Sequence, residues 1–156
     1  MSKVLVVDDE KLIVKGIKFS LEQDDMQVDT AYDGEQAIEA ARNCEYDVVL
    51  LDVMLPKYDG FEVCRTIREF SNMPIIMLTA RGEEQDELFG FELGVDEYIS
   101  KPFSPKILVA RVEALLKRTA KQESNVYDIG GIEIVSSIPR SRVAISFVYN
   151  RVIIRR

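Results

Sequence analysis

The sequence predicts an α/β fold, a doubly wound parallel sheet that is covered by helices on both faces. Strand-like and helix-like segments alternate five times along the chain and are joined by short links, which is the pattern of such a sheet. Two of the strand-like segments, residues 48–51 and 75–78, are apolar at every position, as expected of strands that are buried on both faces. The 156 residues suffice for one domain of this kind and a small appendage.

The first half of the chain contains three strand–helix pairs. The first strand runs into three consecutive acids, and apolar residues then recur at helical spacing. Asp33-Gly34 turns the chain out of the second strand, and Asp59-Gly60 follows the third. The expected strands are residues 3–7, 27–31 and 48–52, and the expected helices are residues 11–23, a segment that begins at Gly34, and residues 60–70.

The second half of the chain contains two more pairs. Gly94 ends the first of its helices. Ser104 caps the second, with Pro105 at its first position. The expected strands are residues 75–78 and 98–100, and the expected helices are residues 83–93 and residues 104 to about 118.

The composition changes after the last helix. Residues 119–125 are polar and lack periodicity, which predicts a linker. Three short β-prone runs follow, separated by turn-forming residues, and this pattern is typical of hairpins. The expected organisation is a domain over residues 1–118, a linker over residues 119–125 and a β-rich tail over residues 126–156, with its strands at 131–135, 142–147 and 151–154.

Charge is distributed unevenly along the chain. The net charge is −7, but residues 139–156 hold five arginines and no acid, so residues 1–138 carry 15 basic and 27 acidic side chains, a net charge of −12. So acidic a body is expected to repel nucleic acid and to attract divalent cations or basic partners. The chain has no histidine, which excludes histidine-based catalysis and histidine-ligated metals.

Cysteine usage and hydropathy bear on the compartment. Cys44 and Cys64 are the two cysteines, and both lie in expected helices as free thiols, which indicates a reducing compartment. No apolar run approaches the roughly 20 residues of a membrane span, and the first residues do not form a signal peptide. We therefore expect a cytoplasmic protein without a membrane partner.

Polar side chains end four of the five expected strands. Asp8 and Asp9 follow the first strand, Asp52 ends the third, Thr79 follows the fourth and Lys101 follows the fifth. The carboxyl ends of parallel strands share one edge, where open α/β sheets bind ligands. Three neighbouring carboxylates repel one another unless a cation lies among them. An all-oxygen site suits Mg²⁺, with Mn²⁺ as an alternative ion.

Each of these residues also has an ordinary structural explanation. The acids at residues 8–10 complement the dipole of the following helix, Asp52 caps a loop, and Lys101-Pro102 forms a surface turn. Together at one edge, however, the ammonium and the hydroxyl are placed to hold anionic oxygens beside a metal ion. This combination favours phosphoryl transfer to a nucleophilic carboxylate, which gives an aspartyl phosphate.

Five segments of the chain resemble the receiver domains of two-component response regulators. They are Val4–Glu10, Leu51–Pro56, Asp59-Gly60, Leu78–Ala80 and Tyr98–Phe103. The resemblance covers residues 1–118. It implies a flavodoxin-like sheet with the strand order 2-1-3-4-5 and five helices.

The resemblance also implies the roles of the acidic residues. Asp52 would accept a phosphoryl group from a sensor histidine kinase. Asp9, Asp52 and the backbone carbonyl of Met54 would ligate Mg²⁺ directly, and Asp8 would act through water.

Four further positions would respond to the phosphoryl group. Lys101 would pair with its oxygens, and the Lys101–Pro102 peptide bond would be cis. Thr79, with its neighbour Ala80, would meet the phosphoryl group, and Tyr98 would rotate inward behind Thr79 as the switch.

The last helix and the residues after the linker resemble winged-helix (OmpR/PhoB-type) transcriptional regulators. In that subfamily the fourth helix, fifth strand and fifth helix form a homodimer face with ion pairs between subunits. The chain keeps one of these pairs, Glu97 with Arg111. In the second pair, Glu87 stands where a basic residue is usual and Ile107 where its acidic partner is usual. In the third, Glu92 would face Glu113 instead of a lysine. We expect a weakened or re-registered dimer, with a face that includes Leu88, Phe91, Glu97, Leu108 and Arg111.

The tail departs from that subfamily. Residues 126–156 show no helical periodicity, whereas a winged-helix domain needs a recognition helix for the major groove. The tail therefore resembles only the first strands of such a domain, and DNA binding is expected only where the effector domain is complete. Its arginines indicate either nucleic-acid contact or a solubilising charge.

Three other functions compete with a response regulator that controls transcription. A stand-alone receiver would act by protein contact alone. An aspartyl-phosphate phosphatase needs a second acid two residues after the nucleophile, where this chain has Met54. We therefore expect only self-phosphorylation from a phosphodonor and slow self-dephosphorylation. A flavodoxin-like electron carrier needs a phosphate-binding loop, where the acids at residues 8–10 would repel the flavin phosphate.

Overall fold

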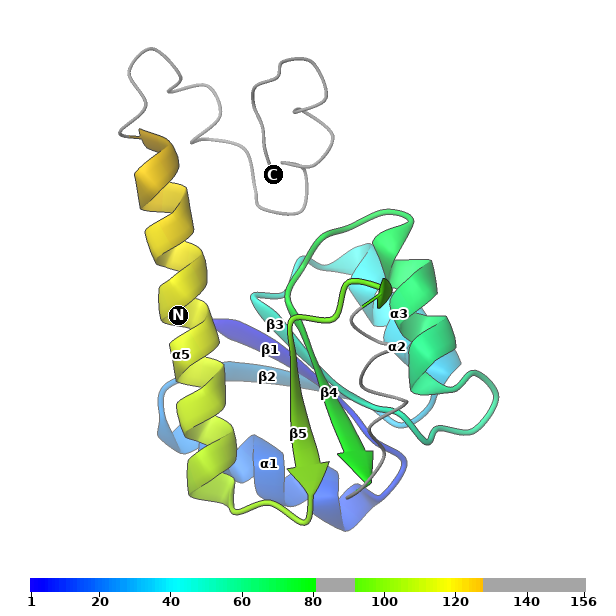
Figure 1. The fold of residues 1–156 in the computed structure, drawn as a ribbon. Coiled ribbons are helices and arrows are strands. Elements are labelled where there is room, and N and C mark those ends of the chain that lie inside the picture. Colours follow the sequence, from blue (N-terminus) through cyan, green and yellow to red (C-terminus); the bar gives the residue numbers. More distant parts are fainter. Residues whose placement is uncertain (81–91, 128–156) are drawn as a thin grey trace.

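The computed structural model describes residues 1–80 and 92–127, with side chains up to Ala120. It contains a five-stranded parallel sheet in the order β2-β1-β3-β4-β5, so the predicted flavodoxin-like class and strand order are confirmed (Figure 1). The elements, in chain order, are β1 (Lys3–Val7), α1 (Lys11–Gln23), β2 (Gln27–Ala31), α2 (Gly34–Asn43), β3 (Val48–Asp52), α3 (Gly60–Arg68), β4 (Ile75–Ala80), β5 (Glu97–Lys101) and α5 (Pro105–Tyr127).

The described helices divide between the two faces of the sheet, α2 and α3 on one and α1 and α5 on the other (Figure 1). Successive side chains of a strand point to opposite faces. In β3, Val49 and Leu51 accordingly join the core under α2 and α3, whereas Val48 and Leu50 join the core under α1 and α5. Each face of the central strands therefore needs apolar residues, which explains why β3 and β4 lack a polar face.

The register of the sheet brings the strand ends to one edge. Val7 of β1 pairs with Leu51 of β3, and Asp52 pairs with Leu78 of β4. Asp8 directly follows β1, and Lys101 is the last residue of β5. The polar residues that the sequence places at strand ends are therefore neighbours in space.

The predicted linker at residues 119–125 is helical in the structure, because α5 continues to Tyr127 instead of ending near Arg118. Residues 106–127 contain neither glycine nor proline, and their Ala, Lys, Gln and Glu residues are good helix formers. The Thr119 hydroxyl donates to the Leu115 carbonyl, 2.9 Å away, within the helix. The last helix is therefore longer than expected, and the division of the chain into a domain, a linker and a tail stays a prediction.

Other boundaries differ by one or two residues: α3 ends at Arg68, β4 reaches Ala80 and β5 begins at Glu97. Most of the predicted helix at residues 83–93, with Leu88 and Phe91 of the expected dimer face, lies outside the described residues, as do the strands predicted in the tail. In the described part of the chain, no helix is both long and apolar enough to cross a membrane.

Candidate functional site

Three carboxylates meet at the carboxyl edge of the sheet. Asp8, Asp9 and Asp52 each have an oxygen within 4.8 Å of those of the other two. Asp8 is fully buried and Asp52 is 5% exposed, whereas Asp9 is exposed. The structure thus assembles the predicted acidic cluster, with two acids held in the protein and the third facing solvent.

Lys101 is the cation that faces this cluster. Its Nζ lies 2.8 Å from Oδ2 of Asp8 and 3.4 Å from Oδ2 of Asp52, with Oε1 of Glu10 at 4.0 Å. The Lys101–Pro102 peptide bond is cis, as the resemblance implied. The Lys101 ammonium therefore contacts both buried carboxylates from β5, the edge strand of the sheet.

The remaining oxygens of the buried acids accept backbone hydrogen bonds. The amide of Glu10 donates to Oδ1 of Asp8 over 2.9 Å, and the amide of Met54 donates to Oδ1 of Asp52 over 3.3 Å. Each carboxylate is thereby oriented with one oxygen towards the loop and the other towards Lys101.

Burial and charge shift the protonation equilibria of this site. Burial, assisted by the negative charge of Asp8, raises the pKa of Asp52 to about 6, although Lys101 and the Met54 amide oppose this effect. Burial alone would lower the pKa of Lys101, but its hydrogen bond to Asp8 and the charge of Asp52 outweigh burial and raise it. Lys101 therefore stays charged, and Asp52 is an ionised carboxylate held at a cost in free energy.

The site fits a hard divalent cation. Three carboxylates face one ammonium, which leaves excess negative charge, and every side chain that can act as a ligand offers oxygen. Such a donor set suits Mg²⁺ or Mn²⁺. Met54, whose amide contacts Asp52, is 74% exposed, so the loop that follows Asp52 lies at the surface.

Thr79 has an unsatisfied hydroxyl. Its side chain is 1% exposed, and its Oγ1 has no hydrogen-bond partner among the described residues. Buried polar atoms nearly always have a hydrogen-bond partner. A ligand with oxygen atoms at this strand end would accept a hydrogen bond from the Thr79 hydroxyl. Its neighbour Ala80 is exposed, at the end of β4 opposite Lys101.

Gly60 is a structural requirement of the site that the sequence alone does not reveal. A Cβ atom on this residue would lie 2.4 Å from the backbone oxygen of Asp52 and 2.8 Å from Cα of Val53. The Gly60 amide also donates to the Val53 carbonyl over 2.8 Å. The Asp59-Gly60 turn was recognised from sequence, but its contact with the backbone of Asp52 depends on the fold.

The loop after β3 is also fastened to α2. Lys57 has a positive φ of 69°, and its Nζ lies 3.3 Å from Oε1 of Glu35 and 3.7 Å from Oδ2 of Asp33. Gly34 lets Tyr58 approach, because a Cβ on Gly34 would lie 2.6 Å from that of Tyr58. No signal in the sequence identifies Lys57 as a loop contact.

The predicted switch and dimer residues lie around β5 and α5. Tyr98 is half-buried against the core under α2 and α3. Glu97 and Arg111 form an ion pair within the chain, with 2.8 Å between Oε1 and Nη1. Leu108 of α5 was expected on the dimer face, but it is fully buried in the core between α5 and the sheet. Its neighbour Ile107 is 52% exposed.

Comparisons with known proteins show the family of the chain. The family model described as the response regulator receiver domain matches residues 4–113. The chain is 50% identical over 120 residues to the transcriptional regulatory protein ResD of Bacillus subtilis, which covers 77% of this chain and 50% of ResD. The chain thus spans about half the length of that relative.

Solved structures give the same result. The structure of DrrB, a Thermotoga maritima OmpR/PhoB homologue, is 43% identical and superposes with a TM-score of 0.67 over 76% of this chain and 54% of DrrB. A structure of the BeF3-activated DrrB receiver domain is 42% identical, with a TM-score of 0.68 over 75% of this chain and 98% of that domain.

Proposed function

The chain belongs to the response regulator receiver domain family, and we propose that Asp52 is the residue that accepts a phosphoryl group in it. The observation that carries this proposal is the position of Asp52, a carboxylate 5% exposed at the end of the central strand and 3.4 Å from the Lys101 ammonium. Its other oxygen accepts a hydrogen bond from the amide of Met54, in the surface loop after β3.

In the proposed reaction, a carboxylate oxygen of Asp52 attacks the phosphorus atom of a phosphohistidine on a sensor kinase. The new P–O bond forms as the P–N bond breaks, and the histidine leaves with a proton. Asp9, Asp52 and the Met54 carbonyl are the residues that would hold Mg²⁺, with Asp8 acting through water. When bound, the ion neutralises negative charge on the transferring group and the carboxylates.

Lys101 and Thr79 would then hold the product. Lys101 already lies between the two buried acids, so a short movement would transfer its ammonium to a phosphoryl oxygen, as a charge-assisted hydrogen bond. The buried Thr79 hydroxyl, together with the chain at Ala80, would turn to the same group. Tyr98, on the neighbouring strand, would follow Thr79 inward and so change the surface at β5.

A phosphorylation assay tests the assignment of Asp52. The full chain is incubated with Mg²⁺ and acetyl phosphate, and the hydroxylamine-sensitive phosphoryl group is measured by intact mass. We expect modification of the wild-type chain and none of Asp52→Asn. The control is Asp25→Asn, because Asp25 is exposed and has a φ of 63°, a conformation that asparagine also adopts. Equal modification of Asp52→Asn and the wild-type chain would rule out Asp52 as the acceptor.

We further propose that the receiver, residues 1–118, controls transcription through an effector domain of the OmpR/PhoB type that begins near residue 126. The names of ResD and DrrB support this inference. A homodimer through the helix before β5, β5 itself and α5 would join two receivers. DNA binding by the full-length gene product, measured with and without acetyl phosphate, tests the link to transcription; equal affinity in both states contradicts it.

A further inference from the structure

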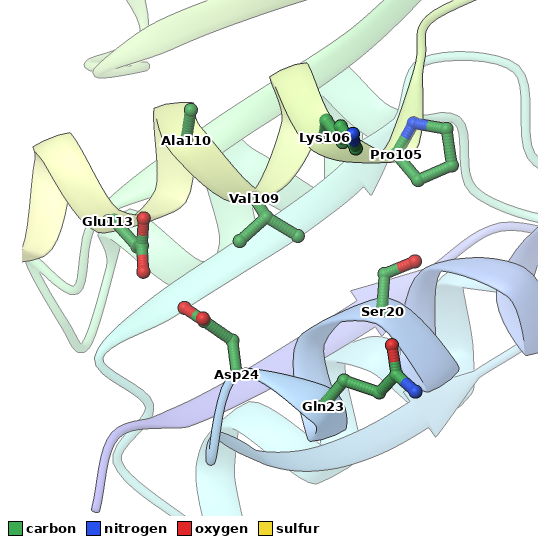
Figure 2. Close-up of a pocket in the computed structure, with 8 residues that line it drawn as sticks. All are labelled: Ser20, Gln23, Asp24, Pro105, Lys106, Val109, Ala110 and Glu113. Atoms are coloured by element: carbon green, nitrogen blue, oxygen red, sulfur yellow. The ribbon is translucent and has the colours of Figure 1, made fainter.

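A groove lies between the C-terminal part of α1 and the first half of α5, and none of the residues of the carboxylate site lines it. Its volume is about 380 Å³. Figure 2 shows that α1 contributes polar side chains and that Val109 of α5 points towards them as the apolar side of the groove. The groove therefore offers both apolar contact and hydrogen-bonding groups.

Two carboxylates face each other across one end of this groove. Asp24, which follows α1, points towards Glu113 of α5, and Lys106 lies at the opposite end (Figure 2). A hydrogen bond that protonated Glu113 donates to Asp24, together with the negative charge of Asp24, raises the pKa of Glu113, whereas Lys117 lowers it. Two neighbouring acids at one end of the groove, with Lys106 at the other end, leave a place for additional positive charge beside the acids.

An arginine side chain suits this end of the groove. Its planar guanidinium can donate to two carboxylates at once. Its aliphatic stem can lie along Val109 while the charged head reaches the acids. A hydrated ammonium would gain less from the apolar side of the groove.

We propose that the arginine-rich segment of this same chain, residues 139–156, binds in the α1–α5 groove with an arginine between Asp24 and Glu113. The segment has five arginines and no acid, whereas residues 1–138 carry a net charge of −12. The two parts of the chain are therefore electrostatically complementary.

The chain is long enough for this contact. Helix α5 leads from Glu113 to Tyr127, a rise of about 21 Å at 1.5 Å per residue. The stretch from Tyr127 to Arg140 can extend to roughly 43 Å. Arg140 and Arg142 can thus return to the groove without any change in the helix, and they are the arginines that we assign to the acid pair.

Limited digestion of the full chain with trypsin tests the contact, because trypsin cleaves after arginine. Mass spectrometry follows cleavage after Arg140 and Arg142 at low ionic strength, where exposed charges are least screened. Cleavage of a segment in equilibrium with its released state follows the released fraction. We expect Asp24→Asn/Glu113→Gln to be cleaved about three- to tenfold faster than the wild-type chain.

The matched control is Glu39→Gln/Glu69→Gln, which removes the same charge from exposed positions on and beside other helices. It should be cleaved at the wild-type rate. Three results would each overturn the proposal: an unchanged rate in the groove variant, equal acceleration in the control, or protection that rises with protein concentration. The last result would assign the groove to the segment of a second copy.

A second measurement does not depend on proteolysis. Arg140→Gln/Arg142→Gln should shift the backbone amide resonances of residues 20–24 and 109–113 in the wild-type background. The same substitutions should leave these resonances unchanged in the Asp24→Asn/Glu113→Gln background, because the partners are already absent. Equal shifts in both backgrounds, or no shift in either, would contradict the contact.

Discussion

The side chain of Asp52 combines a buried position with a negative charge, and the two oppose each other. Asp8, fully buried beside it, adds a second charge of the same sign. The Lys101 ammonium compensates them only in part, since the pKa of Asp52 stays raised, at about 6. At the scale of single residues the site is therefore under electrostatic strain, which a cation or a phosphoryl group with its ion would relieve.

This strain predicts a stability change for Asp52→Asn without divalent ions. A carboxyl group whose pKa rises from 3.8 in the unfolded chain to about 6 on folding binds its proton more tightly in the folded state. The free energy of unfolding therefore falls as the pH rises through this window, by up to about 3 kcal/mol. Asp52→Asn should be more stable than the wild-type chain by about 1 to 3 kcal/mol at pH 8 and by much less at pH 4.

Urea unfolding in EDTA at both pH values measures this difference. Added Mg²⁺ should stabilise the wild-type chain more than the variant, because Asp52 is a proposed ligand. A variant that is less stable than the wild-type chain at pH 8 would show that the Lys101 contact outweighs the cost of burial.

A second residue-scale prediction concerns Gly60. Gly60→Ala places a methyl group 2.4 Å from the Asp52 oxygen, so the backbone that carries Asp52 must move. We expect a loss of about 1 to 3 kcal/mol in the free energy of unfolding and about tenfold weaker Mg²⁺ binding, measured by calorimetry. The matched control is Gly16→Ala in α1. Apart from its chain neighbours and the nearby backbone of its own helix, no atom lies within 4 Å of the new methyl group, and the helix should gain about 0.5 to 1 kcal/mol. Unchanged Mg²⁺ affinity in Gly60→Ala would show that the close approach of Gly60 to the Asp52 backbone is not needed for metal binding.

At the scale of the elements, the sequence is most informative where one local pattern decides the structure. The apolar runs of β3 and β4 can only be buried strands in this setting, and Asp52 at the end of such a run is placed by the strand itself. Residues 119–125 lack an apolar stripe, so hydropathy could not identify them as helix; their propensity and the preceding turns of α5 decide that instead. Local patterns therefore predict strands and strand ends well and polar helix ends poorly.

The side chain of Arg68 joins elements that are distant in sequence. Its guanidinium donates to the carbonyls of Ser71, Met73 and Gly94 over 2.8 to 3.3 Å and reaches Oδ2 of Asp96 at 3.4 Å. It thus ties the end of α3 to the segments that lead into β4 and β5. This contact spans up to 28 residues, which is why no local pattern reveals it.

Arg68→Met should consequently lower the free energy of unfolding by about 2 to 4 kcal/mol, because it leaves several acceptors and the Asp96 charge without this donor. Arg68→Lys should restore only part of the loss, since an ammonium lacks the planar fork. Arg65→Met, at an exposed position of the same helix, should change stability by less than about 0.5 kcal/mol. Denaturant unfolding compares the three variants, and similar values for Arg68→Met and Arg65→Met would refute the role of Arg68.

At the scale of the whole molecule, the proposed phosphorylation site lies at the carboxyl edge of the sheet, and the proposed dimer face lies separately on β5, α5 and the helix before β5. The strand order brings Asp8, Asp52 and Lys101 together at the carboxyl ends of β1, β3 and β5. Sequence reasoning found them because each ends or directly follows a strand. The proposed dimer face is harder to predict, since it depends on which residues α5 leaves exposed. Leu108 turned out to be core, and Ile107 is the exposed apolar residue of that turn.

Assembly of the activated molecule supplies the last prediction. The expected dimer lacks a pair because Glu87 and Ile107 stand where a basic and an acidic residue are usual, and Ile107 is 52% exposed on α5. Glu87→Lys/Ile107→Asp would create that pair and, with beryllofluoride and Mg²⁺, should dimerise about three- to fivefold more tightly than the wild-type chain in sedimentation velocity. Ile107→Asp alone should dimerise less well, because it adds a charge without a partner. If the double variant instead dimerised no better than this single one, the proposed face would not be the surface through which activated chains associate.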